Sequence, residues 1–171
     1  MIEISVKKLT NNLLIDKACS FTVDKEVNVK DYYKMYKSEH SPIRTQMYWI
    51  EMLNIPSFVS VHLVRHKLGV EHFVKSLRDD RGGTGVEDRN TPVNHAMLIN
   101  AQALIYMARK RLCSKAHIET QKVMHDIRDA IDAVDPDLAK AMVVDCVYRG
   151  GCFEFNGCNF YDKYVKGHFN G

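Results

Sequence analysis

Strand-like patterns occupy three segments in the first half of the chain. Residues 2–6 alternate apolar and polar side chains and predict a short strand, and the aromatic-rich residues 43–52 predict a long one. Residues 70–78 alternate again and predict a second long strand. One face of this last strand would carry a largely polar set: His72, Val74, Ser76 and Arg78.

Most of the other segments have signals typical of helices. Pro56 suits the start of a helix because its φ is fixed near the helical value, and Gly69 suits the end of that helix. Thr91 and Pro92 form a cap and first-turn pair. Helices are therefore expected over 13–19, 31–37, 57–67, 92–112, 114–134 and 136–144. With a polar, glycine-rich loop at 79–90, the sequence predicts an α+β fold whose second half is helical.

Composition narrows the class of protein. The 171 residues are 46% hydrophobic and 26% charged, which is ordinary for one globular domain spanning 1–171. A net charge of +3 argues against a basic nucleic-acid-binding arm, although a local pocket for phosphate is compatible with it. No apolar run has the length of a membrane span, and the N-terminus does not resemble a signal peptide. We therefore expect an intracellular protein with no membrane or nucleic-acid partner.

The densest group of chemically capable side chains is Arg65-His66-Lys67, followed by Ser76-Leu77-Arg78. The first motif would place two cations and an imidazole at a helix end, and the second would present a hydroxyl and a guanidinium on one strand face. Arginine suits phosphates and planar carbonyl groups because its fork donates two parallel hydrogen bonds. The structural alternative is a solvated basic helix end beside a polar strand.

Three motifs occur in order between residues 40 and 78: His40-Ser41-Pro42, Arg65-His66-Lys67 and Ser76-Leu77-Arg78. In this order they resemble the core of the flavin-dependent thymidylate synthases. That core has a His-x-Ser-Pro-like start, a strand, a helix that ends in Arg-His-Arg, and then Ser-x-Arg. The chain is thus similar to a short, divergent or phage-type member of this family.

A further block of residues also resembles the family. Asn100-Ala101-Gln102 corresponds to its Asn-Ala-Arg, Arg111 to the Arg that follows, and residues 116–119 to its Ala-Gln-x-Glu. Asn100 and Arg111 are about three helical turns apart, so on one helix they would share a face and lie roughly 16 Å from each other. This separation would let them bind the two ends of an extended ligand. The alternative is a pair of surface polar residues on an amphipathic helix. Residues 146–154 resemble, more loosely, a cysteine-containing C-terminal segment.

The resemblance implies a twisted antiparallel sheet flanked by helices, assembled as a homotetramer with active sites at subunit junctions. It implies methylation of dUMP to dTMP with FAD, NADPH and methylenetetrahydrofolate, in which reduced flavin delivers hydride and the protein supplies positioning and electrostatics. The location implied is the cytoplasm of a bacterial or phage-infected cell. Two alternatives remain open: another modification of a pyrimidine nucleotide, such as hydroxymethylation, and a non-catalytic nucleotide-binding relative.

The resemblance also implies roles for individual residues. Arg111 would hold the uracil and stabilise its anionic form, with Ser76 and Arg78 assigned to the catalytic group beside it. The residues implied in substrate binding are His62, Arg65, Ser76, Arg78 and Arg111. The residues implied in cofactor binding are His40, Arg65, His66, Lys67 and Asn100.

Several positions depart from the family pattern. Lys67 replaces an arginine and loses the bidentate fork, His62 stands for a glutamine, and Gln102 stands for an arginine. One extra residue before Ser76 would reverse the downstream strand faces, so a β-bulge is predicted at 72–75. The segment between Arg78 and Pro92 is also short. Its arginines, Arg81 and Arg89, are the nearest candidates for phosphate ligands, with a loop charge as the alternative for each.

Five cysteines in an intracellular protein are expected to be thiols rather than disulfides. Cys146, Cys152 and Cys158 do not have the spacing of a common zinc ribbon. With Cys113 they could form a four-thiolate site if the tail from 146 to 171 folds back. Reduced, partly buried thiols without a metal are the preferred interpretation.

Overall fold

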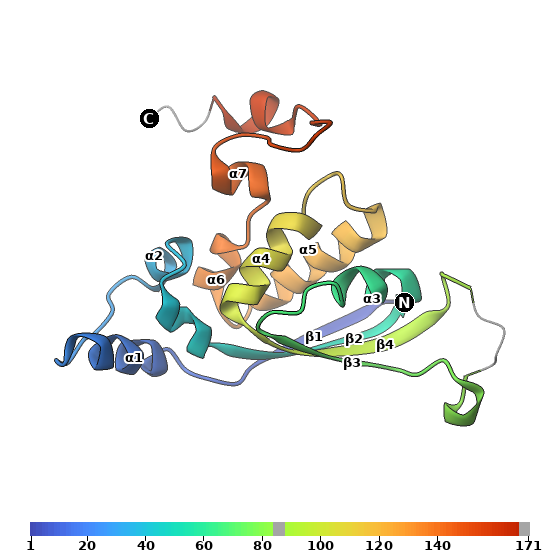
Figure 1. Ribbon diagram of the computed structural model, residues 1–171, viewed down its shortest axis with the longest axis horizontal. Helices are drawn as coiled ribbons and strands as arrows, with labels where there is room; N and C mark the ends of the chain where they lie inside the picture. Colours follow the sequence, from blue (N-terminus) through green and yellow to red (C-terminus); the bar gives the residue numbers. More distant parts are fainter. Residues whose placement is uncertain (84–87, 168–171) are drawn as a thin grey trace.

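The computed structural model of the chain describes residues 1–83 and 88–167. Within these ranges the centre is an antiparallel sheet of four strands in the order β1-β2-β4-β3 (Figure 1). The strands span Glu3–Lys8 (β1), Met47–Pro56 (β2), Val70–Val74 (β3) and Pro92–Asn100 (β4). The expected α+β class with an antiparallel sheet is confirmed.

The helices pack mainly on one face of this sheet. Figure 1 shows α3, α4, α5 and α6 over that face, with α7 and the C-terminal segment stacked further out. The helices span Leu13–Val23 (α1), Tyr32–Lys37 (α2), Ser57–Leu63 (α3), Ala101–Arg111 (α4), Ile118–Asp132 (α5), Pro136–Ala141 (α6) and Asp145–Arg149 (α7). Short 3₁₀ turns lie at Ser41–Thr45 and Asp79–Arg81, and a π turn lies at Tyr161–Val165.

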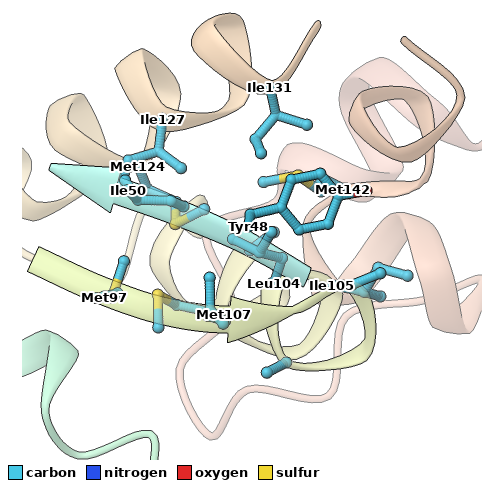
Figure 2. Close-up of a cluster of buried hydrophobic side chains, with 14 of the residues drawn as sticks. Tyr48, Ile50, Met97, Leu104, Ile105, Met107, Met124, Ile127, Ile131 and Met142 are labelled. Carbon is cyan, nitrogen blue, oxygen red and sulfur yellow. The ribbon is translucent and has the colours of Figure 1, made fainter. Parts of the chain in front are cut away.

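Strand alternation decides which side chains enter the core. Tyr48, Ile50 and Met52 of β2 face the helices and are fully buried, as are Met97 and Ile99 of β4. In Figure 2 these strands meet Leu104 and Met107 of α4 and the α5 side chains Met124, Ile127 and Ile131. Each such side chain contributes about 1.5–3 kcal/mol when it is fully buried. The core therefore fixes α4 and α5 firmly against the middle of the sheet.

A buried carboxylate joins this core to the first strand. Asp135 caps the N-terminus of α6, and its Oδ1 accepts from the Leu138 amide at 3.2 Å. Its Oδ2 lies 2.5 Å from Nζ of Lys8 and accepts from the hydroxyls of Tyr36 at 2.9 Å and Tyr48 at 2.6 Å. Burial alone would raise the pKa of Asp135, but the hydrogen bonds from Lys8 and Tyr48 hold it below its ordinary value.

The largest difference from the sequence prediction concerns residues 92–112. They do not form one helix: Pro92–Asn100 is strand β4, and the helix begins only at Ala101. The side chain of Asn100 accepts from the Ala103 amide at 2.9 Å, so Asn100 rather than Thr91 is the helix cap. Pro92 is compatible with the start of a strand, where no ladder donor is needed. Fully buried side chains alternate with exposed or partly buried ones from Val93 to Ile99, which marks the strand.

The predicted β-bulge at 72–75 is wrong. Strands β3 and β4 pair without interruption from Val70 opposite Ile99 to Val74 opposite His95. The irregularity lies in β2 between Met52 and Ile55, where Asn54 takes a positive φ of 59°. The chain bends there because an asparagine tolerates this left-handed conformation.

Other element boundaries shift. The expected strand 43–52 begins only at Met47, the helix predicted to end at 67 ends at Leu63, and the strand predicted to 78 ends at Val74. His117, not Ser114, precedes α5. Helix α1 extends to Val23, beyond the expected end at 19, and α6 ends at Ala141 instead of 144. The predicted loop at 79–90 lies partly outside the described residues.

Replacing Asp135 by alanine should leave Lys8, Tyr36 and Tyr48 without their common acceptor. We expect the free energy of unfolding at neutral pH to fall by about 3–5 kcal/mol, as when one partner of a buried ion pair is removed. Urea unfolding followed by circular dichroism measures this. Asp137→Ala in the same helix is the matched control, because its ion pair with Lys140 is exposed and should contribute about 1 kcal/mol or less. An equal loss in both variants would contradict the role of Asp135.

Candidate functional site

Arg111, at the end of α4, meets the end of α3. Its Nε donates to Nε2 of His66 at 3.1 Å, and its Nη2 donates to the carbonyl of His62 at 2.6 Å. Arg65 lies close enough to lower the pKa of Arg111, after the larger effect of burial. We call His62, Arg65, His66 and Arg111 the Arg111 cluster. Residues that are distant in the sequence thus form one basic cluster.

The Arg111 cluster is positive and poor in counter-charge. Among the described residues, no carboxylate forms an ion pair with Arg65 or Arg111. Burial, followed by the nearby Arg111, lowers the pKa of His66 to about 4, and the same two causes lower the pKa of His62. Both imidazoles are therefore neutral at pH 7 and leave the two guanidinium groups as the charges. Such a site favours an anion or an oxygen that gains negative charge.

Two hydrogen-bonded imidazoles, the buried His95 and the partly buried His72, support the backbone of this site. Ser60 Oγ lies 3.0 Å from Nδ1 of His95, whose Nε2 lies 2.9 Å from Nδ1 of His72. Nε2 of His72 donates to the carbonyl of His66 at 2.8 Å. Only one arrangement of protons satisfies all three contacts when the imidazoles are neutral. The Ser60 hydroxyl donates to Nδ1 of His95, Nε2 of His95 donates to Nδ1 of His72, and Nε2 of His72 donates to the carbonyl of His66. This relay connects α3, β4 and β3 to the backbone that presents the Arg111 cluster.

The sequence pattern does not single out the relay residues. The predicted helix over 92–112 would make His95 a helical histidine, whereas it is a strand residue with only 1% of its surface exposed. His72 is expected on a polar strand face, but the pattern does not name its partners. Thr120, buried on α5, lies 2.8 Å from Nδ1 of His62 and is also missed. The alternation from Val93 to Ile99 is the signal that could have revealed that His95 points into the core.

Asn100 holds the turn that follows the basic motif. The backbone N–H of Asn100 donates to the carbonyl of Gly69 at 2.9 Å. A Cβ on Gly69 would lie 2.5 Å from the side-chain Nδ2 of Asn100. Gly69 also has a φ of 73°, so a larger residue would be both crowded and strained. Asn100 and Arg111 lie at opposite ends of α4. Lys67, in the turn between α3 and Gly69, is exposed.

Ser76 and Arg78 are not joined to the Arg111 cluster within this chain. They follow the end of β3, at the opposite end of that strand from Gly69. Arg78 is exposed and forms a bidentate pair with Asp80 at 2.9 and 2.7 Å. Ser76 accepts from the Arg78 amide at 3.4 Å. Their assignment to the site therefore stays a prediction that depends on contact with another subunit.

Gln102 belongs to a largely buried polar group that does not include His40. His40 itself is exposed at the start of the 3₁₀ turn Ser41–Thr45. The preceding Glu39, which has a positive φ of 51°, accepts from Nε2 of Gln102 at 2.5 Å and forms an ion pair with Arg109. Gln102 is thus engaged inside the chain, where the family arginine would carry a charge.

The two loop arginines have different settings. The guanidinium of Arg89 lies 4.7 Å from the ring centre of Phe58, and its charge contributes to the lowered pKa of His62. Arg89 therefore approaches the Arg111 cluster from the side of α3. Arg81 lies exposed in the 3₁₀ turn Asp79–Arg81. Of the two, Arg89 is the better placed to meet a ligand phosphate.

Four cysteines gather around one small cavity of about 80 Å³: Cys113, Cys146, Cys152 and Cys158. Each is a free thiol, as is the buried Cys19. Burial raises the pKa of Cys146, and the neighbouring Cys152 and Cys113 raise it further. A hydrogen bond with Ser114 lowers the pKa of Cys158. In the part of the chain that is described, no three metal-binding side chains are arranged to hold a metal ion.

The α+β fold of this chain, with its four-stranded antiparallel sheet, is similar to the fold of flavin-dependent thymidylate synthases. It is similar to thymidylate synthase X (ThyX) from Helicobacter pylori with FAD and dUMP, with a TM-score of 0.70 at 14% identity, over 84% of this chain and 99% of that chain. A second Helicobacter pylori structure, with FAD and dUMP, has a TM-score of 0.69 at 14% identity and covers 82% and 99%.

The UMP/dUMP methylase PolB from Streptomyces cacaoi, bound with 5-Br dUMP, has a TM-score of 0.64 at 14% identity, over 82% of this chain and 94% of that chain. Similar folds thus occur in enzymes that modify dUMP. No protein-family profile and no curated sequence matches the chain. Among the described helices, none is long and apolar enough to cross a membrane.

The buried histidines predict a loss of stability in mild acid. Burial lowers the pKa of both His66 and His95 to about 4, so between pH 6.5 and 4 the unfolded chain binds more protons than the folded chain. The free energy of unfolding should therefore fall as the pH drops through this window, by up to about 1.4 kcal/mol per pH unit for each histidine. Urea unfolding at a series of pH values measures the slope.

His95→Gln should make this slope shallower, because one of the two titrating groups is removed. His125→Gln, at an exposed position on α5, is the matched control for the substitution itself. A slope in His95→Gln as steep as that of the unchanged protein would rule out a buried neutral His95.

Proposed function

We propose that this protein is an enzyme that methylates dUMP to dTMP, with FAD as cofactor and NADPH and methylenetetrahydrofolate as co-substrates. The observation that carries the proposal is the Arg111 cluster, on a fold similar to that of dUMP-modifying enzymes. In this cluster two guanidinium groups lie together with no carboxylate partner among the residues that the structure describes. Such a donor set suits the anionic oxygens of a nucleotide and of a uracil ring that becomes negative during the reaction.

Arg111 would bind the uracil. Two of its N–H groups are already committed to His66 and to the carbonyl of His62, which fix the plane of the guanidinium. The remaining N–H groups can donate to a ring carbonyl. Because the neutral His66 accepts from Arg111, the guanidinium keeps its full charge to stabilise a uracil anion. The neighbouring Arg65 and Arg89 would bind the phosphate end.

The donor set fits FAD as well. Arg65, His66 and Lys67 form a basic turn that can meet the flavin phosphates and carbonyls, and His40 and Asn100 would flank the bound cofactor. When bound, the reduced flavin supplies the hydride for the methyl group. The residues of this chain bind and orient the uracil, exclude water and hold the negative charge.

Ser76 and Arg78 would complete the substrate site of a neighbouring subunit in a homotetramer. Both lie on a segment after β3, and none of the described helices covers the outer face of the sheet in Figure 1. That face carries Trp49 and Phe73, whose ring centres are 5.5 Å apart and of which Phe73 is 53% exposed. A face with exposed aromatic side chains suits self-association.

One observation favours a second candidate, a nucleotide-binding relative with different or no chemistry. Gln102 is buried against Glu39, so this position offers no charge to a cofactor. The alternative product, a hydroxymethylated nucleotide, differs from dTMP by one oxygen and is distinguished by mass.

Turnover of dUMP tests the proposal directly. The purified protein should absorb visible light as a flavoprotein, and it should release tritium from uracil-labelled dUMP when NADPH and methylenetetrahydrofolate are present. Arg111→Lys keeps the charge but loses the fork, and we expect about a hundredfold lower turnover, comparable to the loss of one transition-state donor. Arg128→Lys on α5 is the control. Failure to take up FAD or to turn over dUMP would refute the proposal.

Mixing two inactive variants tests whether the site spans subunits. Arg111→Ala and Arg78→Ala should each lose most activity, because each removes a substrate cation. Subunit exchange between them should restore part of the activity, since some junctions would then contain both native arginines. Arg111→Ala mixed with Arg65→Ala should not recover, because both residues lie in one cluster of one chain. No recovery in either mixture, or a monomeric mass by light scattering, would count against a shared site.

A further inference from the structure

A cavity of about 570 Å³ lies between α2, α4, α6 and α7. Its volume is in the range of small-molecule binding sites. Its lining includes none of the four residues of the Arg111 cluster. An adjoining hollow of about 390 Å³ contains His66 and shares Arg109, Tyr148 and Arg149 with the cavity. The two sites are therefore neighbours with separate binding groups.

Basic side chains from four helices line the cavity: Lys37, Arg109, Lys140 and Arg149. Among the described residues that line it, none is a carboxylate. Lys140 has a partner in Asp137 at 3.9 Å and Arg149 has one in Asp145 at 3.5 Å, both long contacts between partly exposed groups. Such pairs are weak, so both cations can turn to a ligand. Basic side chains from four helices thus meet at one cavity.

Arg109 is the buried member of this set. Only 6% of its surface is exposed, and its ion pair with Glu39 uses one side of the guanidinium. Its Nε is buried and has no hydrogen-bond acceptor among the residues that the structure describes. A buried unpaired donor costs about 1–3 kcal/mol, so Arg109 is held at this position at a cost in stability.

Tyrosine rings form the other part of the lining, and they suit a flat ligand. The centre of the Tyr148 ring lies 3.4 Å from the guanidinium carbon of Arg109, and Tyr33 lines the cavity from α2. Tyr161 also lines the cavity, whereas Tyr36, which borders it, is fully buried and takes no part in stacking. Tyrosine offers a flat apolar face and a polar tip, which together suit a base and a sugar.

We propose that this cavity binds a nucleoside triphosphate at a site separate from the Arg111 cluster. The base stacks against the tyrosines, and the phosphates meet Lys37, Lys140 and Arg149, with Arg109 at the buried end. The four basic side chains come from four different helices around the cavity, and this spread suits a chain of phosphates better than a single phosphate group. This site does not depend on the methylation of dUMP.

Isothermal titration of the unmodified protein with ATP, dTTP and inorganic triphosphate tests the site. Both nucleotides should bind more tightly than inorganic triphosphate, because only they can stack on the tyrosines, and binding should weaken as salt is added. Lys37→Ala and Lys140→Ala should each weaken nucleotide binding about tenfold, the loss of one charge-assisted hydrogen bond. The tighter binder of ATP and dTTP identifies the preferred base.

Three control variants distinguish this cavity from the Arg111 cluster and from nonspecific attraction between charges. Lys122→Ala, at an exposed position on α5, should leave the triphosphate affinity unchanged, and Asp137→Asn should leave it unchanged or tighter. Arg111→Ala should abolish dUMP binding without changing triphosphate binding. The proposal is overturned if no nucleotide binds, if inorganic triphosphate binds as well as the nucleotides, or if only Arg111→Ala weakens their binding.

Discussion

The buried carboxylate of Asp135 is the interaction on which the arrangement of layers depends. One oxygen receives Lys8 from β1, Tyr36 from α2 and Tyr48 from β2, while the other caps α6. These elements are far apart in the sequence, and hydrophobic contact alone would let them slide. A charge taken out of water requires all its donors in place, so it selects one arrangement of the sheet edge, α2 and α6.

The candidate site depends on the junction at which β4 passes directly into α4. Asn100 ends the strand, caps the helix and holds the turn at Gly69. Helix α4 then carries Arg111 to the end of α3, where His66 and the carbonyl of His62 receive it. The relay through His72 and His95 supports that backbone from inside the sheet. A guanidinium that is held rigidly by two of its N–H groups suits the binding of a planar anion by the others.

The two proposed sites share a single structural element. Helix α4 presents Arg111 at its end to the proposed dUMP site, and it presents Arg109 from its side to the cavity beside α2 and α6. Tyr148 of α7 covers Arg109 and also borders the hollow next to His66. A ligand in the cavity would therefore contact the helix that positions the proposed uracil-binding group.

The sequence by itself determined the α+β class and the basic motif Arg65-His66-Lys67, because local spacing and residue type suffice for these. It did not determine that residues 92–100 form a strand, since an apolar segment with a capping signal fits a helix equally well until a neighbouring strand supplies its hydrogen bonds. Nor could it place His95 or Arg78, because the surroundings of both depend on how other elements pack. Only the tertiary structure decided these points, since burial and pairing depend on contacts between residues that are distant along the chain.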